Sequence, residues 1–249
     1  MRSRFLPFVL LVVGTLRLPA ADLLLAATES ELQPIIARLE QPQTETRAGW
    51  QFWLGSIHGR SVVLTRTEDD PLNAVAATTL AIRRYEPKLV LTFGAARAHD
   101  PALQPGDLVL SREFAAFDGM VSPHRDSGAG TAPLAWRKLP HALITPGEKE
   151  VYQDRFPADA PTLALAEKVF AARGHVVAGV LGSAYQVNRE ADRIAALRTL
   201  WGTSTENHDS AHIAGCARLL GVPVFGLHVI ADQPGQAAGL VLQLLEGMK

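Results

Sequence analysis

The segment from Thr205 to Cys216 reads TENHDSAHIAGC and holds two histidines four residues apart, His208 and His212. Asp209 follows the first histidine, so HDSAH has Asp where the zinc-protease pattern H-E-x-x-H has Glu. Two imidazoles four apart on one helix share a face and could bind a metal. A hydrolytic zinc site also needs a third ligand and a base, and no companion motif follows. The alternative is that Asp209 and Ser210 begin a helix and His208 precedes it.

Further carboxylates follow apolar segments of the chain. Glu29 and Glu31 come just after the run DLLLAA (22–27), and Asp232 ends the run VPVFGLHVIAD. Acidic residues in the first turn of a helix are stabilised by the helix dipole, which is one interpretation of the two glutamates. In open α/β sheets, however, ligands bind at the carboxyl ends of strands. By position alone, Asp232 is either a helix cap or a catalytic group.

The elements that would carry these residues alternate between strands and helices. Buried strands are predicted at 22–27, 88–98, 106–117, 175–185 and 222–232, and a β-hairpin at 50–67 with its turn near His58–Gly59. Helices are predicted at 29–40, 71–85, 160–174, 209–221 and 235–249. Residues 118–161 are rich in Pro, Gly and Ser and predict a long irregular excursion. We therefore expect an α/β fold, a single-domain three-layer αβα sandwich around a mixed, mostly parallel central sheet.

Composition narrows the classes of partner. The chain has 249 residues, is 47% hydrophobic and 20% charged, and carries a formal net charge of −1. These values are typical of a globular protein and give no sign of a nucleic-acid-binding surface. A small molecule or a protein is therefore the expected partner. The single cysteine, Cys216, cannot form an intramolecular disulfide.

The first 21 residues have the layout of a secretory signal peptide. Arg2 and Arg4 precede an apolar run over 5–16, and the small-residue stretch LPAA follows. The run is shorter than the roughly 20 apolar residues that a membrane-spanning helix needs. We expect a mature domain at 22–249 and a secreted or periplasmic location. An uncleaved anchor, or a misassigned start with a cytoplasmic protein, is the alternative.

Four segments, taken in chain order, resemble the nucleoside phosphorylase superfamily, and within it the methylthioadenosine/S-adenosylhomocysteine nucleosidases. AATESEL is similar to a G-A-M-x-x-E turn, and PLNAVAATTLAI to the first long helix of that branch. LTFGAARAHDPALQPGDLVLS is similar to a T-G-x-A-G-G turn with the glycine-aspartate strand after it. TENHDSAHIAGCARLLGVPVFGLHVIAD is similar to E-M-E-x-A-A-x-A, then N-V-P, then R-A-I-S-D. The resemblance covers nearly all of the chain after the leader.

The resemblance implies a purine nucleoside N-glycosidase that hydrolyses an adenine-type nucleoside to free base and sugar. Asp232 stands where the family has the acid that protonates the purine at N7, and Glu31 where the nucleosidases have the carboxylate that activates water. Dividing these roles between two carboxylates is the logic of inverting glycosidases. Val187 falls near the position of the aromatic that stacks on the base, with Tyr185 as a substitute. No metal and no cofactor are implied.

The resemblance also implies a sugar site. Asp209 stands where a Glu binds the ribose 2′- and 3′-hydroxyls, and His208 replaces a Met that packs under the sugar. Ala95 and Ala96 lie in the turn beside the ribose and the attacking water. Arg97 stands where the family usually has Gly, so its side chain would either intrude on the site or bind an anion.

Two other functions remain open on the sequence. In a phosphorylase of the same fold, Arg60, Arg66 and Arg97 would form the guanidinium clamp that phosphate recognition favours. A nucleoside- or anion-binding protein without activity would explain the departures around the ribose. Members of the family are often dimers, so the resemblance suggests a homodimer.

Overall fold

The structure is a computed structural model that describes residues 21–147, 150–231 and 235–248. The predicted leader, apart from Ala21, and the predicted acid Asp232 lie outside these residues. The helices are α1 (Glu29–Ile36), α2 (Pro71–Tyr85), α3 (Ala160–Val169), α4 (Ala191–Trp201), α5 (Ser210–Leu220) and α6 (Gln236–Gly247), with a short 3-10 turn at Pro133–Ala135. The strands are β1 (Asp22–Ala26), β2 (Glu40–Arg47), β3 (Trp50–Ile57), β4 (Arg60–Arg66), β5 (Leu89–Ala98), β6 (Leu108–Ala116), β7 (Met120–Val121), β8 (Arg137–Lys138), β9 (His141–Leu143), β10 (Val151–Gln153), β11 (Phe156–Pro157), β12 (Val176–Ser183), β13 (Thr203–Asn207) and β14 (Val224–Ile230).

The central sheet is mixed, as predicted. Its strands run in the order β11-β6-β12-β13-β5-β1-β4-β3-β2, and β14 pairs with both β5 and β6. Strand β1 is parallel to β4 and β5, β14 is parallel to β5, and β12 is parallel to β6 and β13. The hairpin β2-β3-β4 and the pairs β5-β13, β6-β14 and β6-β11 are antiparallel. Because β14 bridges β5 and β6, five strands close into a ring, and the ends of β5, β13 and β14 meet.

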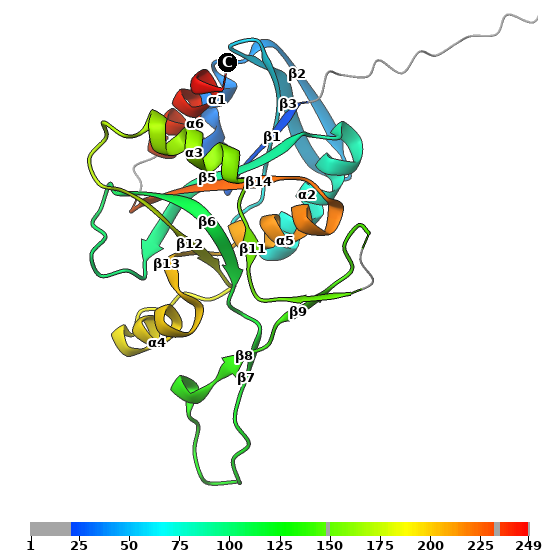
Figure 1. Ribbon diagram of the computed structural model, residues 1–249. Coiled ribbons are helices and arrows are strands. Elements are labelled where there is room, and N and C mark those ends of the chain that lie inside the picture. The colour runs from blue at the N-terminus through cyan, green and yellow to red at the C-terminus, as the bar shows by residue number, and fades with distance from the viewer. Residues whose placement is uncertain (1–20, 148–149, 232–234, 249) are drawn as a thin grey trace, which may run out of the picture.

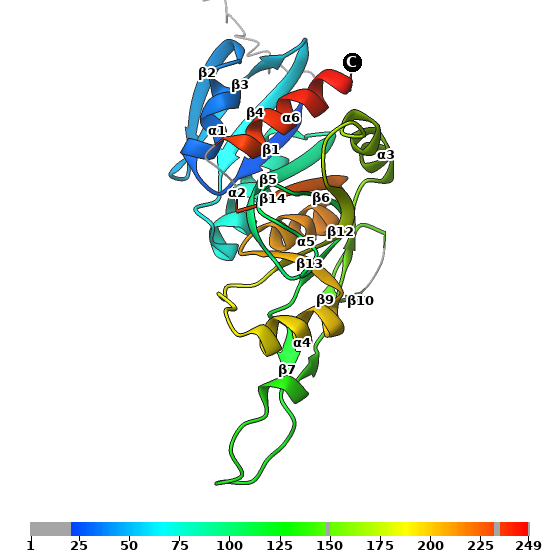
Figure 2. The ribbon, with the colours of Figure 1, turned by 90° about the vertical axis from the view of Figure 1, so that its left-hand side faces the viewer.

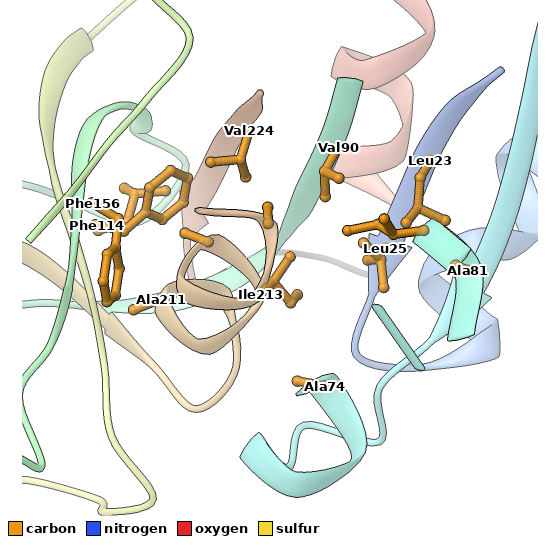
Figure 3. Close-up of a cluster of buried hydrophobic side chains, with 14 of the residues drawn as sticks. Leu23, Leu25, Ala74, Ala81, Val90, Phe114, Phe156, Ala211, Ile213 and Val224 are labelled. Atoms are coloured by element: carbon orange, nitrogen blue, oxygen red, sulfur yellow. The ribbon is translucent and has the colours of Figure 1, made fainter. Parts of the chain in front are cut away.

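Helices cover both faces of the sheet, which confirms the three-layer αβα architecture. Figures 1 and 2 show α1, α3 and α6 on one side and α2 and α5 on the other. Buried alanines on α2 and α5, such as Ala81 and Ala214, let these two helices pack closely. Figure 3 shows part of the core on this side of the sheet, a cluster that includes Leu23 and Leu25 of β1 and Ile213 of α5. No helix in the described part of the chain is long and apolar enough to span a membrane.

Local signals set the start of α2 and the end of α5. The side chain of Asp70 caps α2 by accepting hydrogen bonds from the N–H groups of Leu72 and Asn73, and Pro71 occupies the first turn. Gly221 ends α5 in the left-handed region, at φ +71°. Both ends agree with the sequence prediction.

Other segments differ from what the sequence pattern indicates. The hairpin of β3 and β4 turns at His58–Gly59 as predicted, but β2 adds a strand to it that the sequence did not predict. That strand is polar and almost wholly exposed, so it lacks the apolar alternation that indicates a strand. The excursion at 118–161 holds the short pairs β7-β8 and β9-β10, and its β7-β8 arm projects from the body (Figure 2).

Arg60 does not form part of a phosphate clamp. Its guanidinium donates to Oδ2 of Asp22 at 2.6 and 2.9 Å and to the carbonyl oxygen of Met248 at 3.0 Å. The Asp22 side chain is fully buried, so this ion pair stabilises the start of β1. Arg66, by contrast, pairs with Glu29 and Glu68 at the surface.

The two arginines should therefore differ in their effect on stability. Arg60→Ala leaves the buried Asp22 carboxylate without its cation and should lower the free energy of unfolding by about 3 kcal/mol or more. Arg66→Ala, which breaks only exposed pairs, should lower it by less than about 1 kcal/mol. Urea unfolding of both variants measures this, and equal losses would contradict the structural role of Arg60.

Candidate active site

A pocket of about 530 Å³ opens where β5, β13 and β14 end. Its walls are residues 95–98 of β5, residues 206 and 207 of β13 with His208 after them, Ile230 of β14 with Ala231 after it, and Asp69 before α2. Of the predicted site residues, Ala95, Ala96, Arg97 and His208 line this pocket directly. The topology thus brings together segments that lie far apart in the sequence.

Glu31 stands at the edge of this pocket because of how α1 begins. The Thr28 side chain accepts from the N–H of Glu31, and Oε2 of Glu31 accepts from the N–H of Thr28 at 3.0 Å, which together form a capping box. The other carboxylate oxygen, Oε1, lies 3.5 Å from the backbone nitrogen of Ala95, a pocket residue. The cap therefore fixes the carboxylate across the ends of β1 and β5.

Gly94 permits this approach. Its φ is +154°, and a Cβ atom at this position would lie 3.0 Å from Oε1 of Glu31. A larger residue would push the carboxylate away from the strand. The glycine in the turn LTFGAARA therefore leaves room for the close contact with Glu31.

Asp209 lies beside the pocket in a buried position. It is 3% exposed, and its oxygens accept from Oγ1 of Thr67 at 2.5 Å and from Nδ2 of Asn207 at 2.8 Å. Burial raises the pKa of Asp209 to about 6, and the negative charges of Asp69 and Glu31 add to the rise, while the Thr67 hydrogen bond opposes it. Three carboxylates thus act on one another at one end of the site.

A buried network orients Asn207 and through it Asp209. The side-chain oxygen of Asn207 accepts from Ser183 and Ser210, so its nitrogen must face Asp209 and Nε2 of His228, at 2.8 and 3.2 Å. Burial lowers the pKa of His228 to about 3, so the ring is neutral and accepts at Nε2. Sequence reasoning missed both residues, although Asn207 stands inside the TENHD segment and His228 within β14.

His208 lines the pocket and contacts residues from two other segments of the chain. Its Nδ1 lies 2.7 Å from a carboxylate oxygen of Asp69, and its Nε2 lies 3.0 Å from the carbonyl oxygen of Gln186. The Tyr185 ring meets the His208 ring edge-on, with centroids 5.9 Å apart. Both candidates for stacking on the base, Tyr185 and Val187, are exposed, and Tyr185 is placed against the predicted site residue His208 by this ring contact.

Glu206 is a pocket residue that the sequence did not single out. It is buried, and hydrogen bonds from His99 and Asn188 outweigh the effect of burial and hold its pKa below the usual range. Arg97 lies opposite it on β5, with Nη1 3.9 Å from Oε1 of Glu206. The Arg97 side chain is 52% exposed, so its guanidinium remains accessible to an anionic group.

The metal hypothesis for His208 and His212 is not supported. Helix α5 begins at Ser210, so His208 precedes the helix and the pair does not share a helical face. His212 instead turns its Nε2 to Asp118, at 3.1 Å. Within the described residues no group of three metal-binding side chains comes together.

A larger cavity of about 680 Å³ lies beyond Ala98, between the loop after β5 and α4. Its charged side chains are already paired, Arg198 with Asp100 at 2.7 Å and His99 with Glu206 at 3.0 Å. The pocket beside Glu31 is therefore the better candidate for chemistry.

Replacing Asp209 by Asn should stabilise the protein more at pH 8 than at pH 5. Because the folded state raises the pKa of Asp209 to about 6, its stabilising contribution is present below the ordinary carboxyl pKa and is lost as the pH rises through about 6. The part of this contribution that is lost between pH 5 and pH 8 corresponds to roughly one pKa unit, or about 1.4 kcal/mol. Asparagine can still accept from Asn207 and can donate to Thr67. Urea unfolding at both pH values measures the difference, and a pH-independent gap between variant and wild type would contradict it.

Comparisons with known proteins agree with the fold. The family model described as "Phosphorylase superfamily" matches residues 23–244. The 5′-methylthioadenosine/S-adenosylhomocysteine nucleosidase of Bacillus thuringiensis (strain Al Hakam) is 28% identical over 222 residues, which cover 87% of each chain. The solved S-adenosylhomocysteine nucleosidase of Streptococcus pyogenes, in complex with 5-methylthiotubericidin, superposes with a TM-score of 0.75 at 15% identity, over 93% of this chain and 99% of the other. Futalosine hydrolase of Helicobacter pylori strain 26695, solved as a mutant, gives 0.72 at 20% identity, over 92% and 98%. With a family match that spans most of its length, this chain belongs to the phosphorylase superfamily.

Proposed function

We propose that the protein is a purine nucleoside N-glycosidase that hydrolyses an adenine-type nucleoside to free base and sugar. The observation that carries this proposal is the position of Glu31, which the capping box and Gly94 hold at the edge of the pocket. A carboxylate so fixed is placed to activate water. The nucleosidase from Bacillus thuringiensis and the other similar proteins named above support the same substrate class.

The chemistry of the bond explains why a cluster of carboxylates suits this site. An N-glycosidic bond breaks through an oxocarbenium-like state, in which positive charge develops on the sugar. The carboxylates of Glu31, Asp69 and Asp209 lie close enough for their charges to interact. Preorganised negative charge of this kind stabilises the transition state more than the ground state.

The remaining roles come from the sequence resemblance. Asp232 is proposed to donate a proton to N7 of the leaving base, and it follows Ala231, a pocket residue, in the chain. Asp209 is proposed to bind ribose hydroxyls. Its two oxygens already accept one hydrogen bond each, and each carboxylate oxygen can accept a second one.

Hydrolysis is favoured over phosphorolysis by the arginines. Of the three that a phosphate clamp would use, Arg60 binds Asp22 and Arg66 binds Glu29 and Glu68, so Arg97 alone lines the pocket. A single guanidinium is a weak basis for binding a phosphate nucleophile.

We also propose, from the sequence alone, that the protein is exported and forms a homodimer. The support is the signal-peptide layout of residues 1–21 and the family resemblance. The mass of the mature chain in the periplasmic fraction and light scattering of the purified protein test these two points.

A panel of purine nucleosides incubated with and without phosphate tests the function. We expect free base to be released from an adenine nucleoside at the same rate in both conditions. Release that requires phosphate would establish a phosphorylase instead. Tight binding measured by calorimetry without any base release would establish a binding protein.

Isosteric variants test the two proposed catalytic residues. Glu31→Gln keeps the cap and removes the charge, and it should lower kcat by about 100- to 10,000-fold. Asp232→Asn should abolish base release and leave the fold intact. Glu29→Gln is the matched control, because Glu29 lies on the same helix turn and pairs with Arg66, and its rate should stay within about twofold of wild type. A wild-type rate in Glu31→Gln or in Asp232→Asn would remove that residue from the reaction.

A further inference from the structure

Two consecutive residues before α2 adopt a backbone conformation that side chains disfavour. Glu68 and Asp69 have φ values of +55° and +51°, in the left-handed region. Such residues persist when surrounding contacts hold them, and they concentrate at functional sites. The two side chains separate: Glu68 pairs with Arg66 at 2.6 Å, whereas Asp69 lines the pocket.

His208 braces Asp69 in the pocket. Oδ2 of Asp69 lies 2.7 Å from Nδ1 of His208, whose other ring nitrogen is held by the carbonyl oxygen of Gln186 at 3.0 Å. The His208 side chain is only 15% exposed, whereas that of Asp69 is 48% exposed. Within the described part of the chain, Oδ1 of Asp69 makes no hydrogen bond, so a strong acceptor on a fixed side chain is available to a ligand.

The surroundings indicate which part of a nucleoside would meet this oxygen. The charge of Asp69 acts on Asp209, as does that of Glu31, so Asp69 lies at the end of the site where these carboxylates gather. Under the proposed function this is the sugar end, because Glu31 activates the water that attacks the sugar. The donors that a sugar presents are its hydroxyl groups, and a hydroxyl that donates to a carboxylate makes a strong charge-assisted hydrogen bond.

We propose that Asp69, positioned by His208, accepts a hydrogen bond from a sugar hydroxyl of the bound nucleoside. The inference rests on the proposed function and adds a specificity determinant to it. A nucleoside without that hydroxyl would leave the carboxylate facing an apolar group, and an acceptor buried without a donor disfavours binding. The site therefore selects nucleosides with a hydroxylated sugar.

A mutant cycle between Asp69 and each sugar hydroxyl tests the proposal. Asp69→Asn keeps the size of the side chain, and Asn tolerates the left-handed conformation. Binding of adenosine and of its 2′-, 3′- and 5′-deoxy analogues to wild type and variant is measured by calorimetry, with kcat/KM measured in parallel. We expect the variant to bind adenosine at least about tenfold more weakly than wild type does. For the deoxy analogue that lacks the recognised hydroxyl, we expect the variant and the wild type to have equal affinities. Equal losses on all four nucleosides, or no binding of adenosine by wild type, would overturn the proposal.

Two further variants separate this role from structure. Glu68→Gln removes the charge of the neighbouring residue, which has the same backbone conformation but lies outside the pocket. Its adenosine affinity should stay within about twofold of wild type.

Asp69→Gly relieves the left-handed backbone and should keep or raise the melting temperature while still weakening adenosine binding. A lower melting temperature that accounts for the weaker binding would count against the proposal. Calorimetry measures binding whether or not the nucleoside is hydrolysed. If the protein binds adenosine without releasing base, the proposed function is wrong, and the affinities of the mutant cycle still decide whether Asp69 binds a sugar hydroxyl.

Discussion

The contact between Glu31 and strand β5 is the constraint on which the site depends. One carboxylate oxygen closes the capping box of α1, and the other reaches the backbone of Ala95. The first bond is local to the start of α1, whereas the second forms because β1 and β5 are neighbouring parallel strands and Gly94 has no side chain beside Oε1 of Glu31. One side chain therefore caps the first helix and also reaches β5, where its carboxylate is proposed to activate water.

The fold keeps several carboxylates at this end of the sheet by giving each a different environment. Glu206 receives hydrogen bonds from His99 and Asn188, which hold its pKa low. Asp209 is buried near other negative charges, which raises its pKa to about 6. Because of this difference the two neighbouring acids take up protons in different pH ranges, Asp209 as the pH falls through about 6 and Glu206 only at lower pH.

Much of the fold could be predicted from the sequence, because apolar runs and helix-end residues such as Pro71 and Gly221 are local signals. Strand β2 could not, because it is polar and is held only by pairing with β3. In the site, the position of Glu31 after a strand is also consistent with a helix-dipole role, and only the family resemblance singles it out. Asp69 stands just before the quoted segment PLNAVAATTLAI and Glu206 inside TENHDSAHIAGC, but their contacts depend on partners that only the folded chain brings near, such as His208 and His99.

The central claim is that water held at Glu31 breaks the glycosidic bond. The most direct measurement is to incubate the protein with an adenine nucleoside in ¹⁸O-labelled water without phosphate and to analyse the released sugar by mass spectrometry. The account predicts that the sugar carries the label at the anomeric hydroxyl and that free adenine appears in equal amount. Base release that occurs only with added phosphate, giving a sugar phosphate without the label, would contradict it.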